Sequence, residues 1–141
     1  MKDFKHCIWF LPERNHPWYG YSDGFCPHVT IALGLREKEA RDLANDIRVC
    51  DIEVKITNDV RQSCVGDFYA LFCSVEPTDS ENKPEWWPEN AHVSFKYKYN
   101  TPFTEQEIES LRERVSVKSA LLNQMRTVKC SGHFTEWGRF A

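Results

Sequence analysis

The sequence predicts an α+β fold in which one short unit of strands and a helix occurs twice along 141 residues. Both halves have the order strand, loop, histidine-bearing strand, helix and strand. The two histidines, His28 and His92, are separated by 64 residues (92 − 28 = 64), and Phe4 and Phe68 share this offset (68 − 4 = 64). Because the chain is long enough for one core but too short for two independent ones, we expect a single domain over residues 1–141.

The elements of the first half follow from hydrophobic periodicity and from turn residues. Apolar runs that end at proline or glycine predict strands, and apolar residues at i, i+3, i+4 and i+7 predict a helix. That helical stripe consists of Ala40, Leu43, Ala44 and Ile47. The first lobe, about residues 1–60, should contain a strand over 5–11, a loop over 12–27, a strand over 27–33, a helix over 37–48 and a strand over 52–56.

The second half repeats this order over about residues 66–141. Its helix should begin at Thr104, because Thr at the N-cap and Glu107 three residues later form a capping-box pattern. The segment over residues 58–66 is the candidate junction between the lobes. The other predicted elements are a strand over 68–75, a loop over 76–90, a strand over 91–99 and a strand over 126–130.

Composition and charge exclude several classes of protein. The hydrophobic share of 41% is ordinary for a globular chain, and no apolar run approaches the roughly 20 residues that span a bilayer. The net charge of −3 argues against a protein that coats long duplex nucleic acid, so a nucleotide ligand should be small or held locally. Residues 1–6 lack the apolar region of a signal peptide, and we expect a cytoplasmic protein.

The six cysteines indicate neither a metal site nor a disulfide scaffold. None belongs to a C-x-x-C pair, and Cys7, Cys73 and Cys130 lie in apolar, strand-like runs. We therefore expect buried free thiols in a reducing compartment, and no metal or other cofactor.

Each histidine-bearing strand has one apolar and one polar face, because side chains alternate along a strand. The apolar faces consist of Val29, Ile31, Leu33 and Leu35 in the first strand and Val93, Phe95, Tyr97 and Tyr99 in the second. The opposite faces carry His28 with Thr30 and His92 with Ser94. Each strand should therefore turn an imidazole and a hydroxyl away from the core.

This arrangement suits the hydrolysis of a phosphodiester. Two imidazoles can act as general acid and general base near neutral pH, and a hydroxyl on the same face can donate to a phosphoryl oxygen. A third match, His133 with Thr135, has no partner in the repeat and is interpreted as chance. The predicted catalytic residues are His28, Thr30, His92 and Ser94.

The paired motifs resemble those of the 2H phosphoesterase superfamily, which includes the LigT-like RNA phosphodiesterases and the plant and yeast cyclic phosphodiesterases. The motifs here are His28-Val29-Thr30-Ile31 and His92-Val93-Ser94-Phe95. Further similarity to the plant type lies in residues 8–12, 27–30 and 135–137. The resemblance implies a bilobal fold with pseudo-twofold symmetry around a central cleft and no metal. It also implies that one histidine activates water while the other protonates the leaving oxygen.

The chain departs from this family between the first strand and the first motif. Members carry a helix there, whereas residues 12–27 are too rich in Pro and Gly for a long one. Aromatic residues in both loops that precede the His-bearing strands could stack nucleobases at the mouth of the cleft. The candidates for substrate binding are Trp18, Tyr19 and Tyr21 in the first loop and Trp86 and Trp87 in the second. The alternative is that these rings cap a small core.

Lys96 is the remaining candidate for substrate binding. If its strand is regular, Lys96 and Lys98 share the face of His92, and Lys96 could reach a phosphate. An ammonium at that position would lower the pKa of His92. We therefore expect His92 to be the base and His28 to be the acid.

Three functions remain open at this point. The leading prediction is a metal-independent phosphodiesterase that acts on a small nucleotide, above all a 2′,3′-cyclic phosphate. A second enzymatic alternative is degradation of an immune second messenger, such as a 2′-5′ oligoadenylate or a cyclic dinucleotide like cGAMP, as viral members of the superfamily do. The third is a non-catalytic module that binds nucleotides or RNA ends. In each case we expect a monomer whose partner is a small nucleotide or oligonucleotide, and no membrane.

Overall fold

The computed structural model describes residues 6–22, 26–47, 51–57, 59–79, 81 and 83–129. These residues form a mixed α+β fold with a seven-stranded antiparallel sheet and two helices, which confirms the predicted class. The elements are β1 (His6–Pro12), a 3-10 turn (Pro17–Gly20), β2 (Val29–Leu35), α1 (Glu37–Asp46), β3 (Ile52–Ile56), β4 (Arg61–Val65), β5 (Phe68–Pro77), β6 (His92–Tyr99), α2 (Glu105–Arg114) and β7 (Ser119–Lys129).

The order strand, strand, helix, strand occurs in both halves, as β1–β2–α1–β3 and β5–β6–α2–β7. Two elements differ from the prediction. The expected junction between the lobes contains strand β4, and β7 begins at Ser119 rather than near Arg126. The polar pair Asn123-Gln124 interrupts the apolar alternation of β7, and a register shift against β1 falls next to it. Hydrophobic periodicity therefore captured only the end of that strand.

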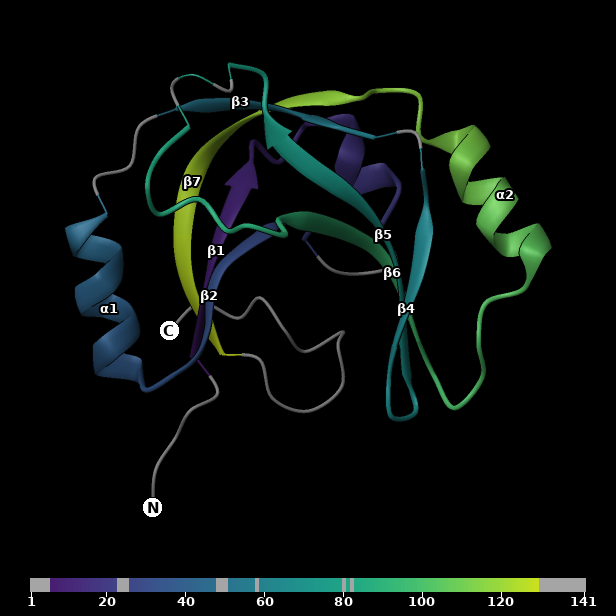
Figure 1. Ribbon diagram of the computed structural model, residues 1–141, viewed down its shortest axis with the longest axis horizontal. Coiled ribbons are helices and arrows are strands. Elements are labelled where there is room, and N and C mark those ends of the chain that lie inside the picture. The colour runs from purple at the N-terminus through teal and green to yellow at the C-terminus, as the bar shows by residue number, and fades with distance from the viewer. Residues whose placement is uncertain are drawn as a thin grey trace.

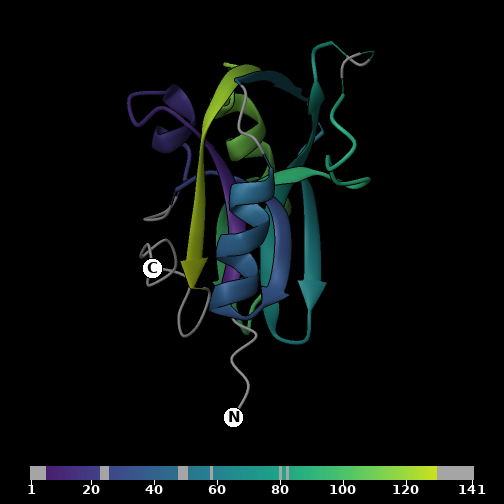
Figure 2. The ribbon, with the colours of Figure 1, turned by 90° about the vertical axis from the view of Figure 1, so that its left-hand side faces the viewer.

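The strands follow the order β3-β7-β1-β2-β6-β5-β4. Strand β3 also pairs with β5, so that the sheet closes on itself through β3, which crosses the top of the molecule in Figure 1. The helices lie at opposite sides of the sheet, with α1 at the left and α2 at the right of that view. Helix α1 packs against β1, β2 and β7, in front of which it lies in Figure 2.

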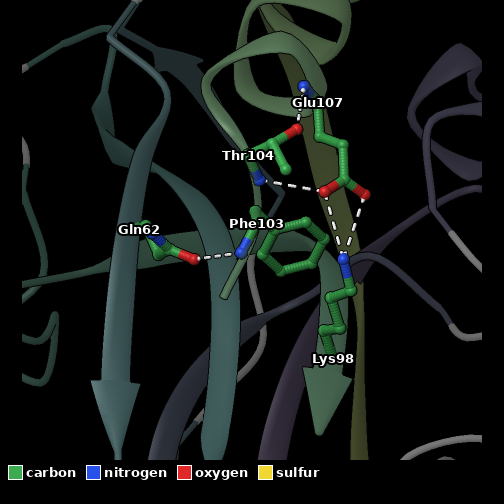
Figure 3. Close-up of polar contacts among 5 residues, drawn as sticks. All are labelled: Gln62, Lys98, Phe103, Thr104 and Glu107. Atoms are coloured by element: carbon green, nitrogen blue, oxygen red, sulfur yellow. Dashed lines mark hydrogen bonds and ion pairs between the residues drawn. The ribbon is translucent and has the colours of Figure 1, made fainter. Parts of the chain in front are cut away.

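Capping residues fix where α2 begins. The Thr104 hydroxyl accepts a hydrogen bond from the backbone N–H of Glu107 (3.1 Å), and the Glu107 carboxylate accepts one from the N–H of Thr104 (2.9 Å), as Figure 3 shows. This reciprocal pair confirms the capping box predicted from the sequence. Neither helix in the described ranges is long and apolar enough to cross a bilayer.

The main hydrophobic core joins the sheet, the 3-10 turn and α2. Its largest fully buried side chains are Trp18, Phe10 and Phe95, and α2 contributes Leu111 and Val115. A smaller cluster on the other side of β1 contains Cys7, Trp9, Leu11 and Val128. Cysteines 7 and 73 are buried free thiols, as expected, whereas Cys64 is exposed.

Strand β6 contains a bulge that changes which side chains share a face. Leu71 of β5 pairs with Lys96, and the next residue, Phe72, pairs with Ser94, so that Phe95 has no partner of its own on β5. One extra residue reverses the alternation that follows it. Consequently Tyr97 and Tyr99, rather than Lys96 and Lys98, continue the face of His92 and Ser94.

Candidate active site

The four predicted catalytic residues lie on one face where β2 and β6 pair. Val29 is the antiparallel partner of Val93, and both valines are fully buried in the main core. Continued by one residue in each direction, this register places His28 opposite Ser94 and Thr30 opposite His92. Because alternate side chains point to opposite faces, all four polar side chains turn away from the main core. Each imidazole therefore stands beside the hydroxyl of the other motif.

Both imidazoles are oriented by the same hydrogen bond. Nδ1 of His28 bonds the carbonyl of Cys26 (2.7 Å), and Nδ1 of His92 bonds the carbonyl of Asn90 (3.1 Å). A carbonyl only accepts, so each Nδ1 carries a proton. Nε2 is then the ring nitrogen that each histidine can present to a substrate, as an acceptor when the ring is neutral and a donor when it is protonated.

The ring of His28 is enclosed. It stacks on Trp9 with 3.5 Å between ring centroids and an interplanar angle of 8°, and only 6% of the residue is exposed. Burial lowers the pKa of His28 to about 4; the Cys26 carbonyl opposes this shift, and the nearby His92 adds to it. At neutral pH His28 is therefore neutral, with a lone pair on Nε2.

His92 has the opposite environment. The residue is exposed, its ring meets the edge of Phe72 at a centroid distance of 5.2 Å, and it borders a cavity of about 1090 Å³. The cavity lies over β3, β4, β5 and the loop of residues 83–91. Of the four predicted catalytic residues, His92 alone lines it within the described part of the chain. The site is therefore closed around His28 and open beside His92.

A serine and an arginine extend the polar face beyond His92. Ser74 is the partner of His92 across β5 and β6, and its Oγ accepts a hydrogen bond from Nη2 of Arg61 on β4 (2.9 Å). The guanidinium also lies over the ring of Phe72, at 5.8 Å from the ring centroid. Sequence reasoning missed both residues, although the polar β4 segment at the expected junction was an available signal.

The aromatic residues of the first loop contribute to structure. Trp18 is fully buried, and its Nε1–H donates to the Val117 carbonyl (2.9 Å), so its ring offers no open face to a nucleobase. The Tyr21 hydroxyl accepts from the Val117 N–H (3.2 Å), and the Tyr19 hydroxyl donates to the Pro12 carbonyl (3.0 Å). The expectation that Trp18 stacks a base is wrong, because the loop folds inward over the core.

One of the two tryptophans of the second loop reaches the open side of the site. Trp87 lines the cavity, although most of its surface packs in the core. Trp86 is half-buried, with its ring centroid 5.9 Å from that of Phe10 and 6.2 Å from that of Trp87. Of the five aromatic candidates, Trp87 is the one that shares the cavity with His92 among the described residues.

Lys96 lies on the opposite side of the sheet from His92. The bulge in β6 pairs it with Leu71, which is fully buried in the main core. Lys98, two residues further, points to α2, where Nζ lies 3.1 Å from Oε1 of Glu107 and 5.3 Å from the ring centroid of Phe103 (Figure 3). The expectation of a face shared by Lys96 and His92 is wrong, because it assumed a regular strand.

This geometry also removes the basis for the expected roles of the histidines. The predicted role of His92 as base depended on the ammonium of Lys96, which lies on the other face. His28, expected to be the acid, has the lowered pKa and carries no proton to donate at neutral pH. The premise of the expected assignment therefore fails, and the lowered pKa of His28 suits a general base.

Within the described residues, no group of three or more His, Cys, Asp or Glu side chains could hold a metal ion. The chance match at His133 and the similarity over residues 135–137 lie outside the described residues. Comparisons of the chain with protein-family models, with curated proteins and with solved structures each find no match.

Proposed function

We propose that the chain is a metal-independent phosphodiesterase that hydrolyses a small nucleotide phosphodiester by two-histidine acid–base catalysis. The observation that carries this proposal is the register of β2 and β6, which groups two imidazoles and two hydroxyls on one face. These groups suffice for the reaction, because hydrolysis needs a base for water, an acid for the leaving oxygen and donors for the phosphoryl oxygens.

The reaction begins with His28. Its neutral Nε2 accepts a proton from water while the water oxygen forms a bond to phosphorus. Nε2 of His92, protonated, donates to the ester oxygen as its bond to phosphorus breaks. The hydroxyls of Thr30 and Ser94 donate to the non-bridging oxygens, on which negative charge increases in the transition state. The products are a phosphomonoester and an alcohol, and proton exchange with solvent restores both imidazoles.

The two sides of the site suit the two reacting groups. Water is small enough to react beside an enclosed imidazole, and His28 is enclosed against Trp9. The leaving alcohol is part of a nucleoside and needs space, which the cavity beside His92 provides. This difference supports the assignment of His28 as base and His92 as acid independently of pKa.

A 2′,3′-cyclic nucleotide is the simplest substrate for such a site. The size of the cavity also favours a second candidate, because about 1090 Å³ lies just above the usual range for small-molecule sites. A 2′-5′ oligoadenylate or a cyclic dinucleotide would use this space more fully than a cyclic mononucleotide. A non-catalytic binding module is disfavoured, because binding alone does not require two imidazoles in matched orientations.

Incubation with a panel of substrates in the presence of EDTA tests the proposal. The panel contains 2′,3′-cyclic mononucleotides, 2′-5′ oligoadenylate and cyclic dinucleotides, and chromatography detects the products. We expect turnover of at least one class, lost in His92→Ala and retained in His16→Asn. The control is suitable because His16 caps the 3-10 turn away from the site, and Asn can also serve as an N-cap. Activity that appears only when a metal ion is added would contradict the mechanism.

A further inference from the structure

The cavity beside His92 carries a net positive charge. Four cationic side chains and two carboxylates line it, so the formal charge of its described lining is +2 (4 − 2 = 2), whereas the whole chain carries −3. The cations are Lys55, Arg61, Lys83 and Lys118, and the carboxylates are Glu76 and Glu89. A positive cavity in an acidic protein concentrates anions locally.

Arg61 is held in place within this cavity. Nη2 donates to Ser74 Oγ at 2.9 Å, Nε lies 3.3 Å from Oδ2 of Asp59, and the guanidinium covers the ring of Phe72. A guanidinium has five N–H donors, so three remain after these two polar contacts. An arginine fixed on three sides loses little conformational freedom when it binds an oxyanion, and its planar fork suits phosphate.

Arg61 and the two histidines lie on different pairs of strands. The scissile phosphate lies above the pair β2–β6 in the proposed reaction. The backbone of Arg61 belongs to β4, which is two strands from β6, or roughly 10 Å at the usual strand spacing. Its guanidinium reaches Ser74, opposite His92, and faces the cavity. The guanidinium therefore lies on the β5 side of His92, away from β2, which suits a different phosphate of the same substrate, one nucleotide away from the reacting bond.

We propose that the cavity binds a second phosphate group, carried by the nucleotide that leaves from the His92 side, and that Arg61 determines this specificity. The walls formed by Phe72 and Trp87 give the base of that nucleotide an apolar surface. The inference rests on the proposed function, because that function defines which side the leaving nucleotide occupies. The preferred substrate would then be an oligonucleotide or a phosphorylated dinucleotide rather than an unphosphorylated cyclic mononucleotide.

The test compares ligands that differ by one phosphate. The His92→Ala substitution blocks turnover in the 141-residue chain. Calorimetry then measures Kd for the dinucleotide ApA and for ApA with a terminal phosphate, at the 5′ or the 3′ end. We expect one phosphorylated form to bind about 10-fold more tightly than ApA, the scale of a charge-assisted hydrogen bond. Adding Arg61→Gln should remove this preference and change the Kd of ApA by less than about 2-fold.

Arg41→Gln is the matched control, because Arg41 and Arg61 are both 54% exposed and each pairs with one carboxylate, but Arg41 lies on α1. It should keep the phosphate preference. Arg61→Lys, which retains the charge but not the fork, should keep part of it. Equal weakening of both ligands by Arg61→Gln would assign Arg61 to the scissile phosphate and overturn the inference, as would a phosphate preference unaffected by Arg61. Binding is measured without turnover, so the two proposals can fail separately. If the phosphate preference depends on Arg61 but the unmodified chain hydrolyses no diester, the proposed function is refuted and the phosphate site is not.

Discussion

His28 at the entry to β2 and His92 at the start of β6 make the same hydrogen bond to a carbonyl two residues earlier, yet one ring is enclosed and the other is exposed. The local backbone is thus matched, while the neighbouring strands differ. Strand β1 places Trp9 against His28, whereas β5 places Ser74 and Phe72 beside His92. Surroundings alone therefore give one residue type two different degrees of enclosure, and they lower the pKa of His28.

The loops that precede the two strands also differ in how far their aromatic residues are buried. The first loop folds inward, so that Trp18 becomes part of the main core. The second loop borders the cavity, with Trp87 in its wall and Trp86 half-buried. Both loops are aromatic in sequence, and among the described residues the second loop is the one that places an aromatic ring in the cavity wall.

The largest expected effect is on the free energy of unfolding, when the tryptophans of the two loops are replaced. Trp18→Ala should lower the free energy of unfolding by about 3–5 kcal/mol, because it removes a fully buried ring and a partly buried hydrogen bond. Trp86→Ala should cost clearly less, since Trp86 is already half-exposed. Urea unfolding of both variants measures the difference. Equal losses would show that the two loops have the same structural role.

The next prediction concerns the two histidines. His28→Ala and His92→Ala should each lower kcat by at least about 10²-fold, the scale for loss of a general acid or base, and the double variant should be little worse than either. Added imidazole should restore part of the activity of His92→Ala, because the cavity admits it, and none of that of His28→Ala. Rescue of both variants would mean that His28 is not enclosed during catalysis.

Acid should destabilise the protein through His28. Its folded pKa of about 4 lies below the usual value of 6.5, so the unfolded chain binds the proton first as pH falls. The contribution of neutral His28 to the free energy of unfolding is complete above about pH 6.5, and about 3 kcal/mol of it is lost by pH 4. His28→Gln should flatten that part of the pH dependence, as measured by urea unfolding between pH 4 and 7. Identical slopes in both proteins would contradict a neutral, buried His28.

The lowered pKa of His28 also determines the pH at which kcat/KM should decline on the acid side. A base must be neutral, so in the free enzyme this limb should fall near pH 4 rather than between pH 5 and 8.5, where two ordinary imidazoles would place both limbs. If the acid limb disappears in His92→Ala and remains in His28→Gln, then His92 is the base and His28 is the acid.

The smallest effect is expected at the hydroxyls. Thr30→Val and Ser94→Ala should each lower kcat/KM by roughly 10-fold, since each removes one donor to the phosphate and leaves both imidazoles in place. Thr30→Ser and Ser94→Thr should restore most of the activity, because they return a hydroxyl. If the conservative variants remain as slow as the others, packing rather than hydrogen bonding explains the loss.

Much of this protein could be predicted from its sequence because the relevant signals are local. Alternation around Val29 and Val93 predicted two strands with His and hydroxyl on one face, and the capping box at Thr104 predicted the start of α2. A spacing of 64 residues indicated that the two motifs belong together. None of these signals depends on which strands become neighbours.

Tertiary structure decided everything that depends on neighbours. The extra residue at the β6 bulge exists only relative to β5, and it moves Lys96 away from His92. Burial against Trp9 lowers the pKa of His28, an effect that no residue within the motif reveals. Arg61 reaches the site because β4 pairs with β5 and brings the guanidinium to Ser74. Side-chain alternation is a property of a single strand, whereas charge, burial and access depend on the strands packed beside it.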